Sequence, residues 1–418
     1  MLTNGLIFSL KFGFSCQIMF NFCFINQTKK GLFKEKVQNY LKNFININDM
    51  GNKTITSERE TEQTKQMKHL ITLKELPTLL FQSQCVLYKN EIIICGGLNQ
   101  RGCYSYNTLK NEYKIICEYP RDVTLWGYCV VKLVDNNKER NHITLLSFGS
   151  DRKGKNKHTL MMKYVSVWSN KSNELNKLNE FNNYNEWIPF TDNQNNPIII
   201  GRDNDDYYFG ARALIGGINN NLLFITYFKN NISVFNLNTF KFIKHNNLPT
   251  DNAIFYHGFI SNSENGKNKK IYQMLLFCKD TGLSIEYNED KNILNFINYM
   301  FVRILHHLIN MHMFVSMILY CFGGDGRYVQ ISIQVFNSRK KWMTFRNTLP
   351  NQLCDCVAIL SEDNRYVHII GGVDDERKPV STHMKTEVSE WLNKEEIKRI
   401  PLNVEKEEEK NEMNVINI

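Results

Sequence analysis

Short apolar segments separated by polar turns recur along most of this 418-residue chain. Each unit opens with an apolar segment, crosses a polar turn and continues in a second apolar segment, as in QCVLYKNEIIICGG from Gln84. A third segment alternates apolar and polar residues, as in VQISIQVFN, and a fourth contains an aromatic residue, as in KKWMTFRN. A period of two is typical of β-strands, so each unit predicts one four-stranded antiparallel sheet.

The units repeat at intervals of about fifty residues, a period that is typical of stacked repeats. One such sheet cannot bury both of its faces alone, and stacking the sheets around an axis leaves few exposed strand edges. In three units the second segment ends in two glycines, which we expect where the backbone is crowded near that axis. These structural glycines are Gly96, Gly97, Gly323, Gly324, Gly371 and Gly372.

The segments CGGLNQRGCYSYNTLKNEY and FGGDGRYVQISIQVFNSRKKW, with their diglycine and later aromatic residues, resemble kelch repeats. The resemblance covers about Lys68 to Trp391 and implies an all-β, six-bladed kelch-type β-propeller at 67–392. The segment at 69–74 is similar to the fourth segments of other units, so we expect this N-terminal strand to close the last blade. The blades are expected near 83–118, 127–190, 210–244, 254–297, 299–345 and 354–391.

The expected fifth blade departs from the pattern, because NYMFVRILHHLINMHMFVSMILYCFGG is continuously apolar and lacks strand alternation. One hypothesis is that roughly Phe301 to Ile318 is out-of-frame sequence, and one alternative is a non-functional copy with a disrupted fifth blade. His306, His307 and His312 fall in this stretch, but no Cys or carboxylate completes a metal site at a recognisable spacing. We therefore expect no metal ion.

The formal net charge of +9 comes from 51 basic and 42 acidic residues spread over the chain, which does not favour a nucleic-acid partner. The 11 Cys include no CxxC pair, and most lie in apolar segments, as is typical of core thiols in a reducing compartment. The expected location is cytoplasmic. Membrane association would require the apolar residues 5–25 to be an anchor. Residues 1–66 are interpreted as a disordered or mis-annotated leader and linker, and 393–418 as a charged tail.

No nucleophile elbow, zinc-protease motif, Walker loop or dinucleotide fingerprint occurs in the sequence. Copper radical oxidases with kelch propellers need two Tyr, two His and a Cys, and the 10 His form no such recognisable set. The expectation is a non-catalytic protein that needs no cofactor. The alternative is a propeller enzyme, either oxidase-like or sugar-processing.

Binding is therefore the expected function, and loops carried by rigid strands are the usual place for it. In kelch propellers the turns between second and third strands gather on one face with the connections between blades. Exposed Arg on such turns suits an acidic peptide, because guanidinium groups pair with carboxylates in a bidentate manner. The candidate partner-binding residues of this interaction scaffold are Arg101, Arg152, Lys153, Lys155, Asp325, Arg327 and Asp374.

Overall fold

The chain divides into two units, Met1–Gln63 and Thr64–Ile418. All residues that the structure describes belong to the second unit. The computed structural model describes residues 70–134, 142–169, 183–201, 207–251, 253–261, 270–278, 281–300, 334–336, 342–344 and 353–390. These residues form β-strands and one short 3-10 turn, Val388–Glu390. Within them, no helix has the length and apolar character needed to cross a membrane.

Four-stranded antiparallel sheets are the repeating element of the second unit, and five of them lie in the described part of the chain. The first blade contains β2 (Gln84–Tyr88), β3 (Glu91–Gly97), β4 (Gln100–Asn107) and β5 (Glu112–Glu118). The second contains β6 (Cys129–Leu133), β7 (His142–Gly149), β8 (His158–Val165) and β9 (Ile188–Pro189). The third contains β10 (Arg212–Gly216), β11 (Leu222–Tyr227), β12 (Asn231–Asn236) and β13 (Lys241–Asn247).

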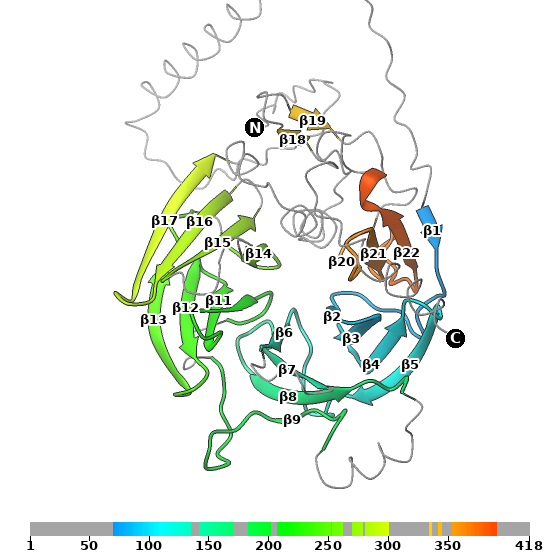
Figure 1. The fold of residues 1–418 in the computed structure, drawn as a ribbon, viewed down its shortest axis with the longest axis horizontal. Coiled ribbons are helices and arrows are strands. Elements are labelled where there is room, and N and C mark those ends of the chain that lie inside the picture. The colour runs from blue at the N-terminus through cyan, green and yellow to red at the C-terminus, as the bar shows by residue number, and fades with distance from the viewer. Residues whose placement is uncertain are drawn as a thin grey trace, which may run out of the picture. The chain divides into compact units, whose positions relative to one another are not determined.

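Two more sheets continue the series. The fourth blade contains β14 (Gly258–Ser261), β15 (Ile271–Cys278), β16 (Thr281–Asn288) and β17 (Ile293–Met300). The closing blade contains β20 (Val357–Leu360), β21 (Tyr366–Ile370), β22 (His383–Glu387) and β1 (Leu70–Thr72). The inner strands β20, β2, β6, β10 and β14 neighbour one another in that order, so the sheets are arranged radially around an axis (Figure 1). This unit is therefore an all-β propeller, as the sequence predicts.

The prediction of six blades is wrong, because the described residues form five. Within the expected range 299–345 the structure describes the last two residues of β17, followed by β18 (Gln334–Phe336) and β19 (Trp342–Thr344), which pair as a two-stranded ladder. The sequence differs from the other units before Gly323, where the apolar and polar alternation on which the prediction relied is absent. The proposed out-of-frame segment Phe301–Ile318, together with Gly323 and Gly324, lies outside the described residues, as do the apolar residues 5–25.

The closing blade is completed by a strand from the opposite end of the chain, which confirms the predicted closure. β1 pairs antiparallel with β22, with Leu70 opposite Thr386 and Thr72 opposite Met384. The pairing continues beyond the strand, because the Leu73 amide donates a hydrogen bond to the His383 carbonyl at 2.9 Å. Without β1, the backbone groups of β22 would form an unpaired sheet edge.

The hydrophobic core lies between adjacent blades. The second strands β3 and β11 are buried along their whole length, whereas the outer strand β5 is largely exposed. Between the first and second blades, the Tyr119 ring stacks on the Trp187 indole at 4.7 Å, and the indole N–H donates to the Cys103 thiol at 3.3 Å. Each described interface between adjacent blades is therefore stabilised by buried apolar side chains from both sheets.

The structure describes seven of the cysteines expected in the core, and not all of them are fully buried. Among the described thiols expected in the core, Cys95, Cys129, Cys278 and Cys356 are buried, while Cys85, Cys117 and Cys354 are partly exposed. Cys321 lies outside the described residues.

Candidate functional site

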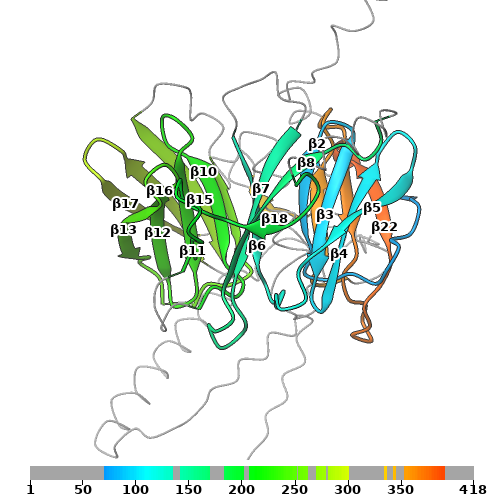
Figure 2. The same cartoon turned by 90° about the horizontal axis from the view of Figure 1, so that it is seen from below.

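One side of the ring, here named the loop face, carries the connections between blades. In each antiparallel sheet the first strand begins at the edge where the second strand ends. The connections between blades and the turns between second and third strands therefore lie on the same side of the ring (Figure 2). Close to the axis, the Gly210 amide donates to the Gly127 carbonyl at 2.6 Å, and the Tyr256 amide donates to the Gly210 carbonyl at 2.8 Å. A Cβ on Gly127 would lie 2.5 Å from the Gly210 nitrogen, so this approach requires glycine.

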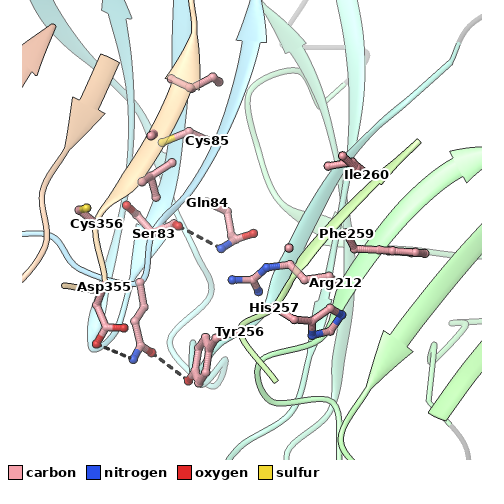
Figure 3. A pocket seen from close by; sticks show the side chains of 15 residues that line it. Ser83, Gln84, Cys85, Arg212, Tyr256, His257, Phe259, Ile260, Asp355 and Cys356 are labelled. Atoms are coloured by element: carbon pink, nitrogen blue, oxygen red, sulfur yellow. Dashed lines mark hydrogen bonds between the residues drawn. The ribbon is translucent and has the colours of Figure 1, made fainter. Parts of the chain in front are cut away.

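An axial cavity of about 240 Å³ opens beside these connections (Figure 3). Its walls come from four blades that are far apart in the sequence. The lining consists of residues 82–85 at the start of β2, Arg212 on β10, 256–260 at the start of β14, and 355–359 at the start of β20. First strands form the innermost layer of the propeller, and for this reason their side chains meet at the axis.

A hydrogen-bonded bridge links three of these blades at the loop-face end of the cavity (Figure 3). Gln82 donates through Nε2 to Asp355 Oδ2 at 3.2 Å and accepts at Oε1 from the Tyr256 hydroxyl at 3.1 Å. Burial raises the pKa of Tyr256 to about 12, against the opposing positive charges of Arg212 and Arg152. The Tyr256 hydroxyl therefore remains a hydrogen-bond donor at neutral pH.

Arg212 is the cationic group of the cavity. Its Nη1 donates to the Ala211 carbonyl at 2.9 Å, and its guanidinium carbon lies 5.8 Å from the centre of the Tyr256 ring. Burial lowers its pKa and the negative charge of Asp355 opposes this, but a guanidinium stays protonated in proteins. Within the described part of the chain, no carboxylate lies within ion-pair distance of Arg212.

Four half-buried aromatic rings gather on the loop face next to the cavity, and we name Tyr207, Phe209, Phe228 and Phe255 the aromatic cluster. Phe228 lies at the centre, with ring centroids 5.8 Å from Tyr207, 5.3 Å from Phe209 and 6.2 Å from Phe255. Phe255 in turn contacts the Tyr256 ring at 6.0 Å. The exposed Lys229 ammonium lies 5.4 Å from the Tyr207 ring. The cluster is both apolar and flanked by positive charge.

Three of the residues predicted to bind a partner lie beside this cluster. Arg152, Lys153 and Lys155 are exposed on the loop between β7 and β8. Asp151 shapes the loop, because its Oδ1 accepts hydrogen bonds from the Lys153 and Lys155 amides, each at 2.8 Å. The Ser150 hydroxyl accepts a hydrogen bond from the Tyr208 amide at 3.0 Å, and Tyr208 lies between Tyr207 and Phe209 of the cluster in the sequence.

The other predicted residues are placed differently. Arg101 lies on β4 and forms an ion pair with Glu118 of β5 at 3.0 Å, so its guanidinium is used within its own blade. Asp374 accepts a hydrogen bond from the Lys378 amide at 2.8 Å and shapes the loop between β21 and β22. Asp325 and Arg327 lie outside the described residues. Of the five candidate residues that the structure describes, Arg152, Lys153 and Lys155 share one loop, whereas Arg101 and Asp374 lie in other blades.

Sequence reasoning missed both Arg212 and the aromatic cluster. The signal that could have found them is a recurring one, since an aromatic residue and a glycine precede the first strand in LWGY, YYFGAR and FYHGF. In the part of the chain that the structure describes, no group of three or more His, Cys, Asp or Glu is arranged to hold a metal ion.

The fold and the axial site define a β-propeller, which is the class to which this chain is assigned. No protein-family model matches the sequence, and no curated protein matches it. Among solved structures, YjhT is similar with a TM-score of 0.42 and 10% identity, over 74% of this chain and 95% of that one. The structure of U3-55K is similar with a TM-score of 0.33 and 8% identity, over 74% of this chain and 83% of that one.

Proposed function

We propose that this chain is a kelch-type propeller that acts as a non-catalytic scaffold and binds an acidic protein segment through the loop face. The observation that carries the proposal is the aromatic cluster bordered by Arg152, Lys153 and Lys155. Half-buried aromatic rings and Arg are the side chains that most often dominate the binding energy of protein interfaces. The diglycines at the end of β3 and after β21 support the kelch assignment.

The rings are held in place before any partner arrives. Phe209, Phe228 and Phe255 contact one another, and the backbone after Phe255 is fixed by the hydrogen bond from the Tyr256 amide to the Gly210 carbonyl. A surface whose side chains are already ordered loses little conformational entropy on binding. The cluster can therefore supply affinity while the neighbouring cations supply orientation.

Charge determines the kind of partner. The loop between β7 and β8 presents three exposed cations, and Lys229 adds a fourth beside the rings. Positive charge next to an apolar patch favours a segment that carries both carboxylates and apolar side chains, and steers its approach. The partner class is thus an acidic peptide with at least one aromatic or aliphatic anchor.

The test is binding of fluorescein-labelled ten-residue peptides that carry Asp or Glu around one Phe or Leu, measured by fluorescence anisotropy. Peptides with Asn and Gln in place of the acids serve as the neutral comparison. We expect Phe228→Ala to weaken binding of the acidic peptides at least tenfold, which corresponds to about 1.4 kcal/mol. Replacing Arg152, Lys153 and Lys155 together by Ser should weaken binding and flatten its dependence on salt.

The matched control replaces three exposed cations at turns on the opposite side of the blades, Lys89, Lys110 and Lys291, by Ser. This variant removes the same charge and should bind like the wild type. Equal losses in both triple variants would mean that only net charge matters. An unchanged affinity in Phe228→Ala would remove the aromatic cluster from the interface, and the proposed function would fail.

A further inference from the structure

The axial cavity has two chemically distinct ends. At the loop-face end lie Arg212, Tyr256 and the Gln82 bridge, which are polar. Deeper along the inner strands, β14 contributes Phe259 and Ile260, and β20 contributes Val357, Ala358 and Ile359. A cavity with a single polar end suits a ligand that is polar at one end and apolar over the rest.

Arg212, at the polar end, has N–H groups that donate to no acceptor among the described residues. A guanidinium has five N–H donors, and the described residues offer one hydrogen-bond acceptor, the Ala211 carbonyl. The side chain lies deep in the propeller yet keeps some accessible surface, because it lines the cavity. A charge removed from bulk water without an ion-pair partner is costly, so an anion in the cavity would be stabilised there.

The nearest acidic group limits how much negative charge the cavity accepts. Asp355 also lines the cavity, and one of its oxygens accepts the hydrogen bond from Gln82. Its field reaches Arg212 although the two groups are not an ion pair. The carboxylate of Asp355 repels anions, so a second negative charge on a ligand that pairs with Arg212 would be unfavourable.

The volume limits the size of the ligand. The cavity measures about 240 Å³. A water molecule occupies about 30 Å³ in the liquid, and pockets for drug-sized ligands begin at about 300 Å³. The cavity is thus large enough for a small organic molecule and too small for a folded peptide segment.

From these observations we infer that the axial cavity binds a small monocarboxylate, whose carboxylate pairs with Arg212 and whose apolar body packs against β14 and β20. The hydrogen bond from Tyr256 to Gln82 lies in the cavity wall, and the Tyr256 ring contacts Phe255 of the aromatic cluster. Because the cavity is too small for a folded peptide segment, its ligand is a free small acid and not the peptide of the proposed function. The two neighbouring sites therefore bind different ligands.

The test uses phenylacetate and hexanoate as probes, with binding to the full-length wild-type protein measured by ligand-observed NMR and isothermal titration calorimetry. We expect dissociation constants of about 1 mM or tighter for ligands of this size. Phenylacetamide has nearly the same shape without the charge, and it should bind at least tenfold more weakly. Succinate, with two charges, should also bind more weakly than hexanoate.

Two variants locate the site. Arg212→Met removes the guanidinium and should abolish the preference for phenylacetate over phenylacetamide. Arg121→Met removes an exposed arginine that does not line the cavity and should leave that preference unchanged. If Arg212→Met does not fold, intermolecular NOEs in the wild type decide, because the phenylacetate ring should contact the methyl groups of Ile260.

The inference is overturned if neither acid binds at 10 mM, if the amide binds as well as the acid, or if the NOEs come from another part of the protein. Phe228→Ala should leave phenylacetate binding intact while it weakens the acidic peptide. The failure of one site is thereby distinguishable from the failure of the other.

Discussion

Buried histidine makes the stability of this propeller depend on pH, and His158 allows the effect to be measured. His158 begins β8 and is buried, and its Nε2 lies 3.3 Å from the Ser147 hydroxyl. Its Nδ1 has no hydrogen-bond partner in the part of the chain that the structure describes. Burial lowers the pKa of His158 from 6.5 to about 4, because the charged imidazolium loses its hydration.

Whether stability rises or falls with pH depends on which state, folded or unfolded, binds the proton more tightly. The unfolded chain takes up a proton near pH 6.5, whereas the folded protein resists it until about pH 4. Stability from His158 is therefore fully present above pH 6.5 and is lost as the pH falls through that window. A tenfold difference in proton affinity corresponds to about 1.4 kcal/mol, so the loss is about 2 kcal/mol at pH 5 and approaches about 3 kcal/mol below pH 4.

The perturbation is His158→Gln, which keeps a polar side chain of similar size and removes the titration. The free energy of unfolding is measured by urea denaturation at pH 8 and at pH 5, with tryptophan fluorescence and far-UV circular dichroism as probes. We expect the variant to lose about 2 kcal/mol less than the wild type between these pH values. Carboxylates titrate equally in both proteins, so they cancel in the comparison. If the two proteins lose the same free energy, His158 is not a buried neutral imidazole and the reasoning fails.

Two further predictions concern the closure of the ring and its glycines. Deleting residues 1–72 removes β1, so we expect a loss of about 2 kcal/mol from its ladder hydrogen bonds and aggregation through the free edge of β22, seen as a lower Tm and increased light scattering. Deleting only residues 1–66 keeps β1 and should change neither quantity; equal effects of both deletions would argue against the closure. Gly371→Ala should destabilise by more than about 2 kcal/mol in urea denaturation, because φ is +61° and the new Cβ would lie 2.2 Å from the Leu80 carbonyl oxygen. Gly102→Ala is the control, since its Cβ meets only the flexible Tyr104 ring, and a cost as large as that of Gly371→Ala would contradict the explanation.

Two buried histidines of the closing blade should make its stability depend on pH in the same way. His368 and His383 are buried and hydrogen-bonded to each other at 3.0 Å, and His383 also contacts the Tyr113 hydroxyl of the first blade at 2.5 Å. Burial lowers the pKa of His368 to about 4, and burial lowers the pKa of His383 well below its usual value, so both are neutral at pH 7. The junction that closes the ring is therefore expected to weaken in acid in the same direction as the core around His158.

The local pattern of the sequence determined the strands and the closure of the ring. Alternation and turn residues are short-range signals, and they suffice to predict the strands β2 to β5. They also predict the pairing of β1 with β22, because a strand without a sheet of its own must complete another sheet. The expected fifth blade has no counterpart among the five described blades. The stretch before Gly323 lacks the alternation on which the prediction relied.

Only the tertiary structure decided which residues meet. The axial cavity joins Gln82, Arg212, Tyr256 and Asp355 from four blades, and no periodicity within one blade indicates that these side chains share a space. Tertiary packing also gave different surroundings to arginines at equivalent positions of two blades. Arg152 remains exposed, whereas Arg101 forms an ion pair with Glu118. A repeat pattern encodes each blade through contacts between neighbours in the chain. The chemistry of the axis depends on residues more than one hundred positions apart, which only the closed ring brings together.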